Sequence, residues 1–176
     1  YRKADDAHST LRLKLYLLGE VLPLSASLPV FENLGMKVIA EDAFSVSFKD
    51  DAGWTHEAVV LDFEMERADE GAAALDDIKA PLEEAFRAVG SGEAESDGFN
   101  RLVLCAGLAW RDVTILRAVT KYLRQAAINF SQDYIEHALG RNPDIARLLV
   151  ELFHTANDPS DNEKRDARLR LVQYAK

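Results

Sequence analysis

The chain has 176 residues, of which 21 are basic and 30 acidic, for a net charge of −9. The acidic balance argues against nucleic acid as a partner, because phosphate binding needs a basic surface. No apolar run approaches the roughly 18 residues that a membrane span requires. A single cysteine excludes an internal disulfide and fits a reducing compartment, so we expect a cytoplasmic protein. The chain begins with Tyr1 and without a signal-peptide pattern, which predicts a piece of a longer protein.

Strand and helix patterns alternate at the start of the chain. Leucine at every second position predicts a strand over Leu11–Leu17. Ser25 or Ser27 can cap a following helix with Pro29 in its first turn. Gly35 then ends that helix as a left-handed C-cap.

Two further strands are predicted on either side of a turn. The first begins at Met36 and continues through apolar residues of period two to Phe48. Asp50–Gly53 has turn chemistry. The next strand has Val59 and every second residue to Met65 on one face, and carboxylates on the other: Asp62, Glu64 and Glu66. This acidic stripe is either a solvated sheet face or an ion-pairing surface between subunits or domains.

An amphipathic helix follows, with apolar residues three or four apart from Leu75 to Val89. Residues 90–98 predict an exposed acidic loop, and the short apolar run Arg101–Cys105 predicts a fourth strand. The resulting order β-α-β-β-α-β is that of the ferredoxin-like fold, an antiparallel sheet with two helices on one face. We therefore assign residues 1–106 to a ferredoxin-like α+β domain, whose open sheet face is a candidate association surface.

Residues 107–176 are predicted to form an all-helical segment. Apolar spacing predicts a helix from Trp110 to Ala126, and Ser131 caps a second helix that ends at Gly140. Pro143 in the first turn starts a third helix through Phe153. The sequence Ser160-x-x-Glu163 is a capping box for a last helix.

Catalytic, cofactor-binding and metal-binding patterns are not found. The four histidines lack metal-ligand spacing, and Gly90-x-Gly92 follows a helix and lacks the third glycine of a dinucleotide fingerprint. Cys105 is interpreted as a buried, inert thiol, with a catalytic thiolate as the unsupported alternative.

Two segments are candidates for contacts. The loop between the first strand and helix is either a plain connection or an effector or subunit contact, because backbone N–H groups at a helix start favour a carboxylate; its residues are Gly19, Glu20, Leu24 and Ser25. A basic helix stripe is either a solvated face or an inter-domain docking site for an acidic surface of the same protein; its residues are Arg117, Lys121 and Arg124. Acidic residues predominate in residues 1–104 and basic residues beyond them, so the first half offers such a surface.

Five blocks of the sequence are distinctive: Leu11–Tyr16, Leu28–Ile39, Leu102–Arg111, Lys121–Gln125 through Phe130–Ile135, and Pro143–Phe153. Together they resemble the large bacterial NAD-specific glutamate dehydrogenases, and the Tyr-Leu-Arg-Gln to Phe-Ser-Gln-x-Tyr-Ile stretch is the most specific. The resemblance extends over roughly residues 11–159 and identifies an N-terminal ACT-like plus helical segment.

The resemblance also implies a function. The parent enzyme oxidises L-glutamate to 2-oxoglutarate and ammonium with NAD⁺, and its catalytic and NAD-binding residues lie elsewhere in the polypeptide. An ACT-like module implies subunit contacts or an amino-acid effector. We therefore expect a non-catalytic regulatory or oligomerisation segment whose partners are the rest of the polypeptide and its homo-oligomer. The alternative is an allosteric or free-standing amino-acid sensor.

Overall fold

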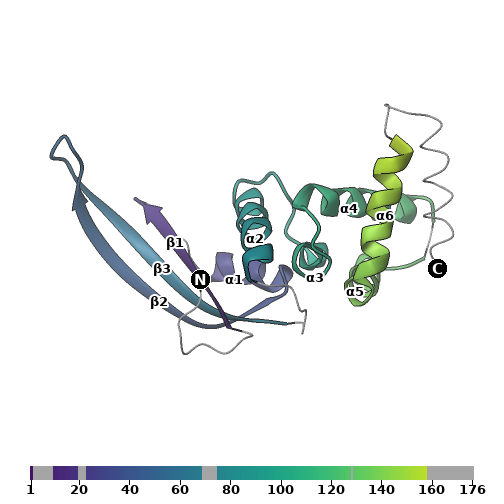
Figure 1. Ribbon diagram of the computed structural model, residues 1–176, viewed down its shortest axis with the longest axis horizontal. Coiled ribbons are helices and arrows are strands. Elements are labelled where there is room, and N and C mark those ends of the chain that lie inside the picture. The colour runs from purple at the N-terminus through teal and green to yellow at the C-terminus, as the bar shows by residue number, and fades with distance from the viewer. Residues whose placement is uncertain (2–9, 20–22, 69–74, 128, 158–176) are drawn as a thin grey trace.

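A computed structural model describes residues 1, 10–19, 23–68, 75–127 and 129–157. A three-stranded antiparallel sheet of order β1-β3-β2 lies at one end and a group of helices at the other (Figure 1). The elements in chain order are β1 (Thr10–Leu18), α1 (Leu24–Asn33), β2 (Met36–Lys49), β3 (Thr55–Arg67), α2 (Leu75–Gly90), the 3₁₀ helix η1 (Gly98–Arg101), α3 (Leu102–Cys105), α4 (Trp110–Gln125), α5 (Gln132–Arg141) and α6 (Pro143–Asn157).

The three predicted strands of the sheet are confirmed. Leu13 lies opposite Phe63 and Leu15 opposite Leu61, so the leucines of β1 share a face with the apolar residues of β3. The register of β2 against β3 shifts once, between Val38 and Ala40. A bulge of this kind moves the following residues to the other face, and Phe44 therefore lies opposite Val60, away from the core.

The first helix begins earlier than predicted. Pro23 takes the N-cap position with an extended backbone, so Ser25 and Ser27 lie inside α1 rather than at its start. The buried Ser27 hydroxyl donates to the Leu24 carbonyl, and Pro29 lies mid-helix rather than in the first turn. The predicted left-handed glycine is confirmed: Gly35 has a φ of +82° directly after the end of α1.

The fourth strand predicted at Arg101–Cys105 is wrong, because this run is helical in η1 and α3. A short apolar run has no periodicity that separates a buried strand from a buried helical turn. The Asp97 side chain accepts the Phe99 N–H and so caps η1. Leu102 and Val103 are buried because helices surround α3 on several sides. The α+β class, an ACT-like antiparallel sheet with helices followed by a helical region, is confirmed.

The three described helices after residue 107 agree with prediction. Ser131 caps α5 by accepting the Tyr134 N–H, and Pro143 is the first residue of α6. The helix α6 continues past Phe153 to Asn157. The predicted capping box at Ser160 and Glu163 lies outside the described residues.

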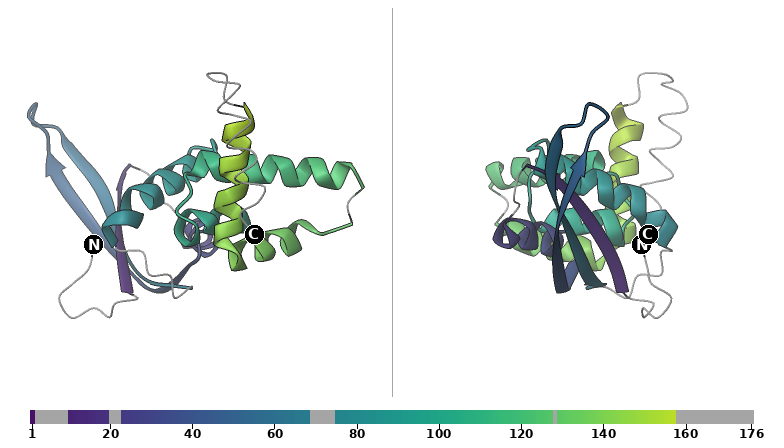
Figure 2. Two further views of the ribbon diagram at one scale, coloured as in Figure 1. Left: turned by 45° about the vertical axis from the view of Figure 1, so that its right-hand side comes forward. Right: turned by 90° about the vertical axis from the view of Figure 1, so that its left-hand side faces the viewer.

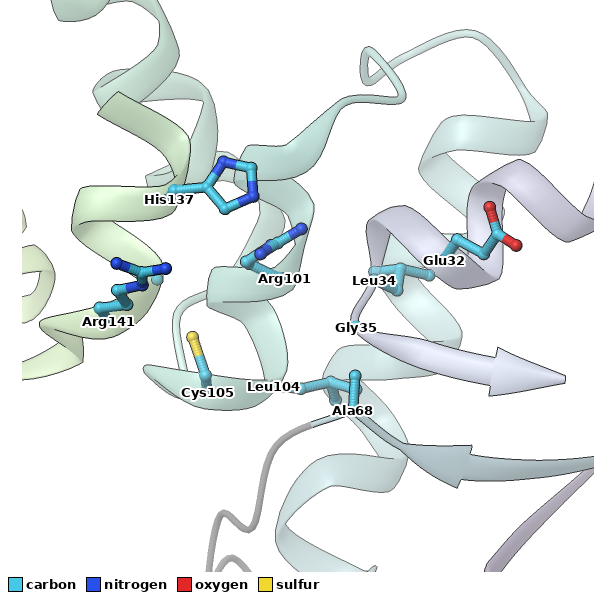
Figure 3. A pocket seen from close by; sticks show the side chains of 10 residues that line it. Glu32, Leu34, Gly35, Ala68, Arg101, Leu104, Cys105, His137 and Arg141 are labelled. Carbon is cyan, nitrogen blue, oxygen red and sulfur yellow. The ribbon is translucent and has the colours of Figure 1, made fainter. Parts of the chain in front are cut away.

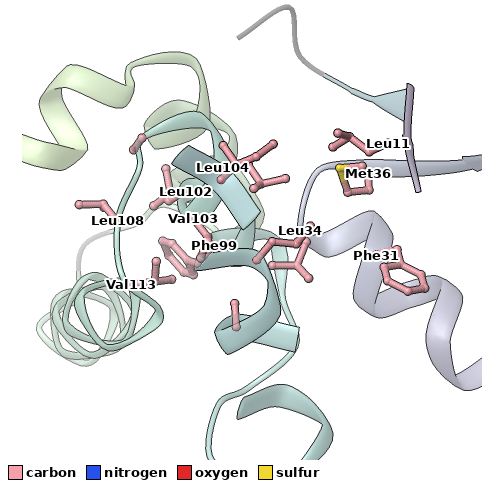
Figure 4. Close-up of a cluster of buried hydrophobic side chains, with 14 of the residues drawn as sticks. Leu11, Phe31, Leu34, Met36, Phe99, Leu102, Val103, Leu104, Leu108 and Val113 are labelled. Carbon is pink, nitrogen blue, oxygen red and sulfur yellow. The ribbon is translucent and has the colours of Figure 1, made fainter. Parts of the chain in front are cut away.

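One continuous apolar core joins the sheet to the helices (Figure 4). Its fully buried members include Phe63 from β3, Phe31 from α1, Phe99 from η1 and Val113 from α4. The sheet uses one face for this core, and Figure 2 shows the helices on that side. The division into domains at residues 106 and 107 stays a prediction.

Candidate functional site

The sheet face opposite the helices is lined by the second set of alternating side chains. In the first half of β1, Arg12 bonds Glu64 at 2.6 Å and Lys14 bonds Asp62 at 3.0 Å. The Tyr1 hydroxyl donates to both Asp62 oxygens, at 2.8 and 2.7 Å. Asp62 and Glu64 of the acidic stripe therefore pair with basic residues of the neighbouring strand, and the Asp62 side chain is only 10% exposed rather than solvated.

These contacts make folding stability depend on pH. Burial raises the pKa of Asp62, but hydrogen bonds from Tyr1 and Lys14 outweigh burial and hold that pKa below its usual value. The stabilisation is therefore complete above the unfolded-state value of about 4 and is lost as pH falls through the lower folded value. We expect urea unfolding to show that Asp62→Asn removes part of the stability at pH 7, and that the difference from the unsubstituted chain shrinks below about pH 4. A difference that does not change with pH would contradict this account.

The far end of the same face is apolar and exposed. Its large side chains are Tyr16 and Leu18 of β1, with Phe44, Val46 and Phe48 of β2, and each is at least 43% exposed. Register places Tyr16 and Phe44 on either side of Val60. We call this set the apolar sheet patch. Apolar clusters of this kind on a folded surface mark contacts with other protein.

The predicted effector loop is only partly brought together. Gly19 has a φ of +71° and lines a hollow of about 440 Å³ with residues of β2 and β3 that include Ser45, Ser47 and Glu57. Leu24 and Ser25 are exposed at the start of α1 and do not line this hollow. Glu20 lies outside the described residues. The role of the loop stays a prediction.

The basic stripe of α4 is not one uniform surface. Arg117 is 3% exposed, which rules out a solvated position for this residue. Its guanidinium donates to both Asp97 oxygens, at 2.7 and 2.8 Å, and to the Asn100 side chain at 2.6 Å. Lys121 donates to Glu95 at 2.6 and 2.8 Å, whereas Arg124 is exposed. Docking between domains by these residues stays a prediction.

Sequence reasoning missed the partners of Arg117. Asp97 combines two roles, since one oxygen caps η1 through the Phe99 N–H and both accept from Arg117. Asn100 is buried and links the Glu95 carbonyl to Arg117. The signal was present, because aspartate before Gly-Phe-Asn is a helix-capping pattern, but the predicted strand concealed it.

Metal and thiol chemistry have little support among the described residues. No cluster of three or more histidine, cysteine or acidic side chains is found there that could hold a metal ion. Each of three exposed histidines bonds a nearby aspartate residue, as His56 does Asp50 at 2.8 Å and His154 does Asp112 at 2.7 Å. Cys105 is half-buried at the end of α3 rather than at the end of a strand. None of the described helices is long and apolar enough to cross a membrane.

Comparison of the sequence with known proteins identifies its family. One family model, described as the glutamate dehydrogenase ACT3 domain, matches residues 1–78. A second, glutamate dehydrogenase helical motif 3, matches residues 94–159. A protein of Halomonas elongata named NAD-specific glutamate dehydrogenase is 41% identical over 161 residues. The chain belongs to the NAD-specific glutamate dehydrogenase family.

Other glutamate dehydrogenases give the same result. The NAD-specific enzyme of Pseudomonas aeruginosa is 39% identical over 156 residues, and that of Mycobacterium tuberculosis is 36% identical over 174. The three alignments cover 92%, 88% and 97% of this chain. They cover only 10%, 9% and 11% of the relatives, so the chain spans about a tenth of the length of these enzymes. The resemblance read from the sequence is confirmed.

Proposed function

We propose that the chain is a non-catalytic regulatory and oligomerisation segment of a large NAD-specific glutamate dehydrogenase. The whole enzyme converts L-glutamate and NAD⁺ to 2-oxoglutarate, ammonium and NADH in the cytoplasm, and the rest of its polypeptide supplies the catalytic and NAD-binding residues. The chain alone is then expected to show no glutamate-dependent reduction of NAD⁺. Its partners are the remainder of the polypeptide and the other copies in a homo-oligomer.

The apolar sheet patch is the observation that carries this proposal. Among the described residues, the core and the helices use only the other face of the sheet, and Tyr16 is 73% and Phe44 51% exposed. Nine-tenths of the length of the relatives lies outside the part that this chain matches, and that length supplies surfaces to cover the patch. The ion pairs of Arg12 and Lys14 at the other end of the face limit the apolar contact to the outer end of the sheet.

A charge placed in the patch tests the assembly role. In an intact glutamate dehydrogenase that contains this chain, Phe44→Asp puts an unpaired carboxylate into the proposed contact. We expect the oligomer to dissociate at protein concentrations on the order of tenfold higher or more, because burying an unpaired charge is costly. Sedimentation velocity measures the mass of the particle, and glutamate-dependent NADH formation measures the activity.

Ser47→Asp is the matched control. Ser47 lies on the same strand as Phe44 and is also exposed, but the register places it on the opposite face of the sheet. This variant is expected to assemble like the unsubstituted enzyme. Equal assembly of the two variants would contradict the proposal.

An amino-acid sensor is the second candidate, and the hollow at Gly19 favours it. Ser45, Ser47 and Glu57 offer hydroxyl groups and a carboxylate there, which suit the polar groups of an amino acid. If this hollow holds an effector, an amino acid should raise the melting temperature of the intact enzyme. Ser47→Asp should then abolish that rise while assembly is kept. An equal rise in melting temperature for the unsubstituted enzyme and for Ser47→Asp would count against the hollow as the site.

A further inference from the structure

A basic pocket lies where the sheet domain meets the helices (Figure 3). It has a volume of about 170 Å³ and is lined from the end of α1, from η1 and α3, and from α5. Its polar side chains include Arg101, His137 and Arg141, and Cys105 also lines it. The pocket is separate from the apolar sheet patch and from the hollow at Gly19.

Arg101 packs closely against Gly140 of α5 and lies near Gly35. A Cβ atom added at Gly140 would lie 2.8 Å from the Arg101 Cδ, a distance that real side chains do not tolerate. A Cβ added at Gly35 would already be in contact with the Arg101 Cβ, at 3.6 Å. The close approach of Gly140 of α5 to the arginine thus depends on a residue without a side chain.

The Arg101 guanidinium is not satisfied by the surrounding protein. Its Nε is buried and has no hydrogen-bond partner among the described residues. A buried donor without an acceptor is destabilising, and more so where the group is charged. Such a group in a native structure calls for an explanation, and a bound water or anion beside the guanidinium is one.

A second arginine adds positive charge to the pocket. Arg141 of α5 lines the same pocket as Arg101 of η1, and neither has an acidic partner in the part of the chain that the structure describes. His137 also lines the pocket, and its Nδ1 donates to the Asp133 carbonyl at 2.8 Å. Glu32 also lines the pocket, but its carboxyl group points away from Arg101 in Figure 3.

We propose that this pocket binds a small oxyanion, a carboxylate or phosphate group, on Arg101 and Arg141. The planar fork of an arginine matches the paired oxygens of either group. Two arginines line this pocket, and neither is used in an ion pair among the described residues. The anion accepts N–H groups of Arg101 and Arg141, which line the pocket from η1 and α5. This site is independent of the assembly role proposed above.

Counting bound anions on the intact polypeptide tests the site. Equilibrium dialysis with radiolabelled inorganic phosphate, and separately with radiolabelled acetate, gives the number bound per chain and the dissociation constants. We expect Arg101→Gln and Arg141→Gln each to weaken one site by on the order of tenfold to a hundredfold, or to remove it. Binding of phosphate alone or of acetate alone identifies which group the pocket prefers. Excess unlabelled anion distinguishes specific from non-specific binding.

Arg124→Gln is the matched control, since Arg124 is an exposed arginine outside the pocket and loses the same charge. It should bind the same number of anions as the unsubstituted protein. Arg141 is exposed, so its variant keeps the test decisive if Arg101→Gln does not fold. The proposal is overturned if Arg141→Gln binds both anions with unchanged number and affinity, or if neither anion binds the unsubstituted protein at this pocket.

Discussion

Replacing Arg117 with alanine is expected to lower the free energy of unfolding by about 3–5 kcal/mol. The arginine is 3% exposed, and its guanidinium bonds Asp97 through two nitrogens. Removing it leaves the Asp97 carboxylate, whose side chain is 15% exposed, without its cation. The same change takes a donor from the buried Asn100 side chain. A partly buried charge without a partner is far more costly than a lost surface ion pair.

Urea unfolding of the chain, followed by circular dichroism, measures this loss. Arg124→Ala is the control, because Arg124 lies on the same helix and is exposed. We expect its effect to stay within about 0.5 kcal/mol. Equal effects of the two substitutions would mean that the network around Asp97 contributes little to stability.

Helical spacing grouped Arg117, Lys121 and Arg124 correctly on one side of α4, but their environments differ. Spacing fixes the direction of a side chain within its helix, whereas burial depends on what packs against that side. Here residues 95–100 lie against α4 at Arg117, so Arg117 is enclosed while Arg124 is not. Such a contact joins segments about 20 residues apart, and the sequence has no local signal for it.

The strands and most helix ends were predictable for the opposite reason. The alternation of Leu11–Leu17 and the caps at Ser131 and Pro143 are local patterns whose physical causes lie within a few residues. The strand predicted at Arg101–Cys105 was wrong, because a run of four or five apolar residues suits a buried strand and a buried helical turn equally. Its surroundings decide the matter, since α3 packs among α2, α4, α5 and α6.

The candidate sites show the same division. Gly19 was identified from loop position and does line a hollow, but the exposed Leu24 and Ser25 do not join it. Arg101 was not singled out, because it was placed at the start of a strand. Only the folded chain brings it between Gly35 and Gly140, which are 105 residues apart in the numbering of the sequence.

Replacing Phe31 with alanine is expected to cost about 3–5 kcal/mol of stability. Phe31 is completely buried, and its ring lies 4.9 Å from that of Phe63 and 5.0 Å from that of Phe86. These three rings join α1, β3 and α2, so the substitution opens a cavity at the point where the helices cover the sheet. Calorimetric or urea unfolding measures the loss.

Phe44→Ala is the control for Phe31→Ala, and the pair separates stability from assembly. Phe44 is 51% exposed on the open sheet face, so we expect its removal to change the stability of the chain by less than about 1 kcal/mol. In the intact enzyme, the same substitution removes apolar area from the proposed contact and should weaken the oligomer. A large stability loss for Phe44→Ala without an effect on assembly would show that the apolar sheet patch contributes to the chain's own fold. A small stability loss together with a weakened oligomer would place the contact of this segment with its enzyme on the sheet face that the core leaves open.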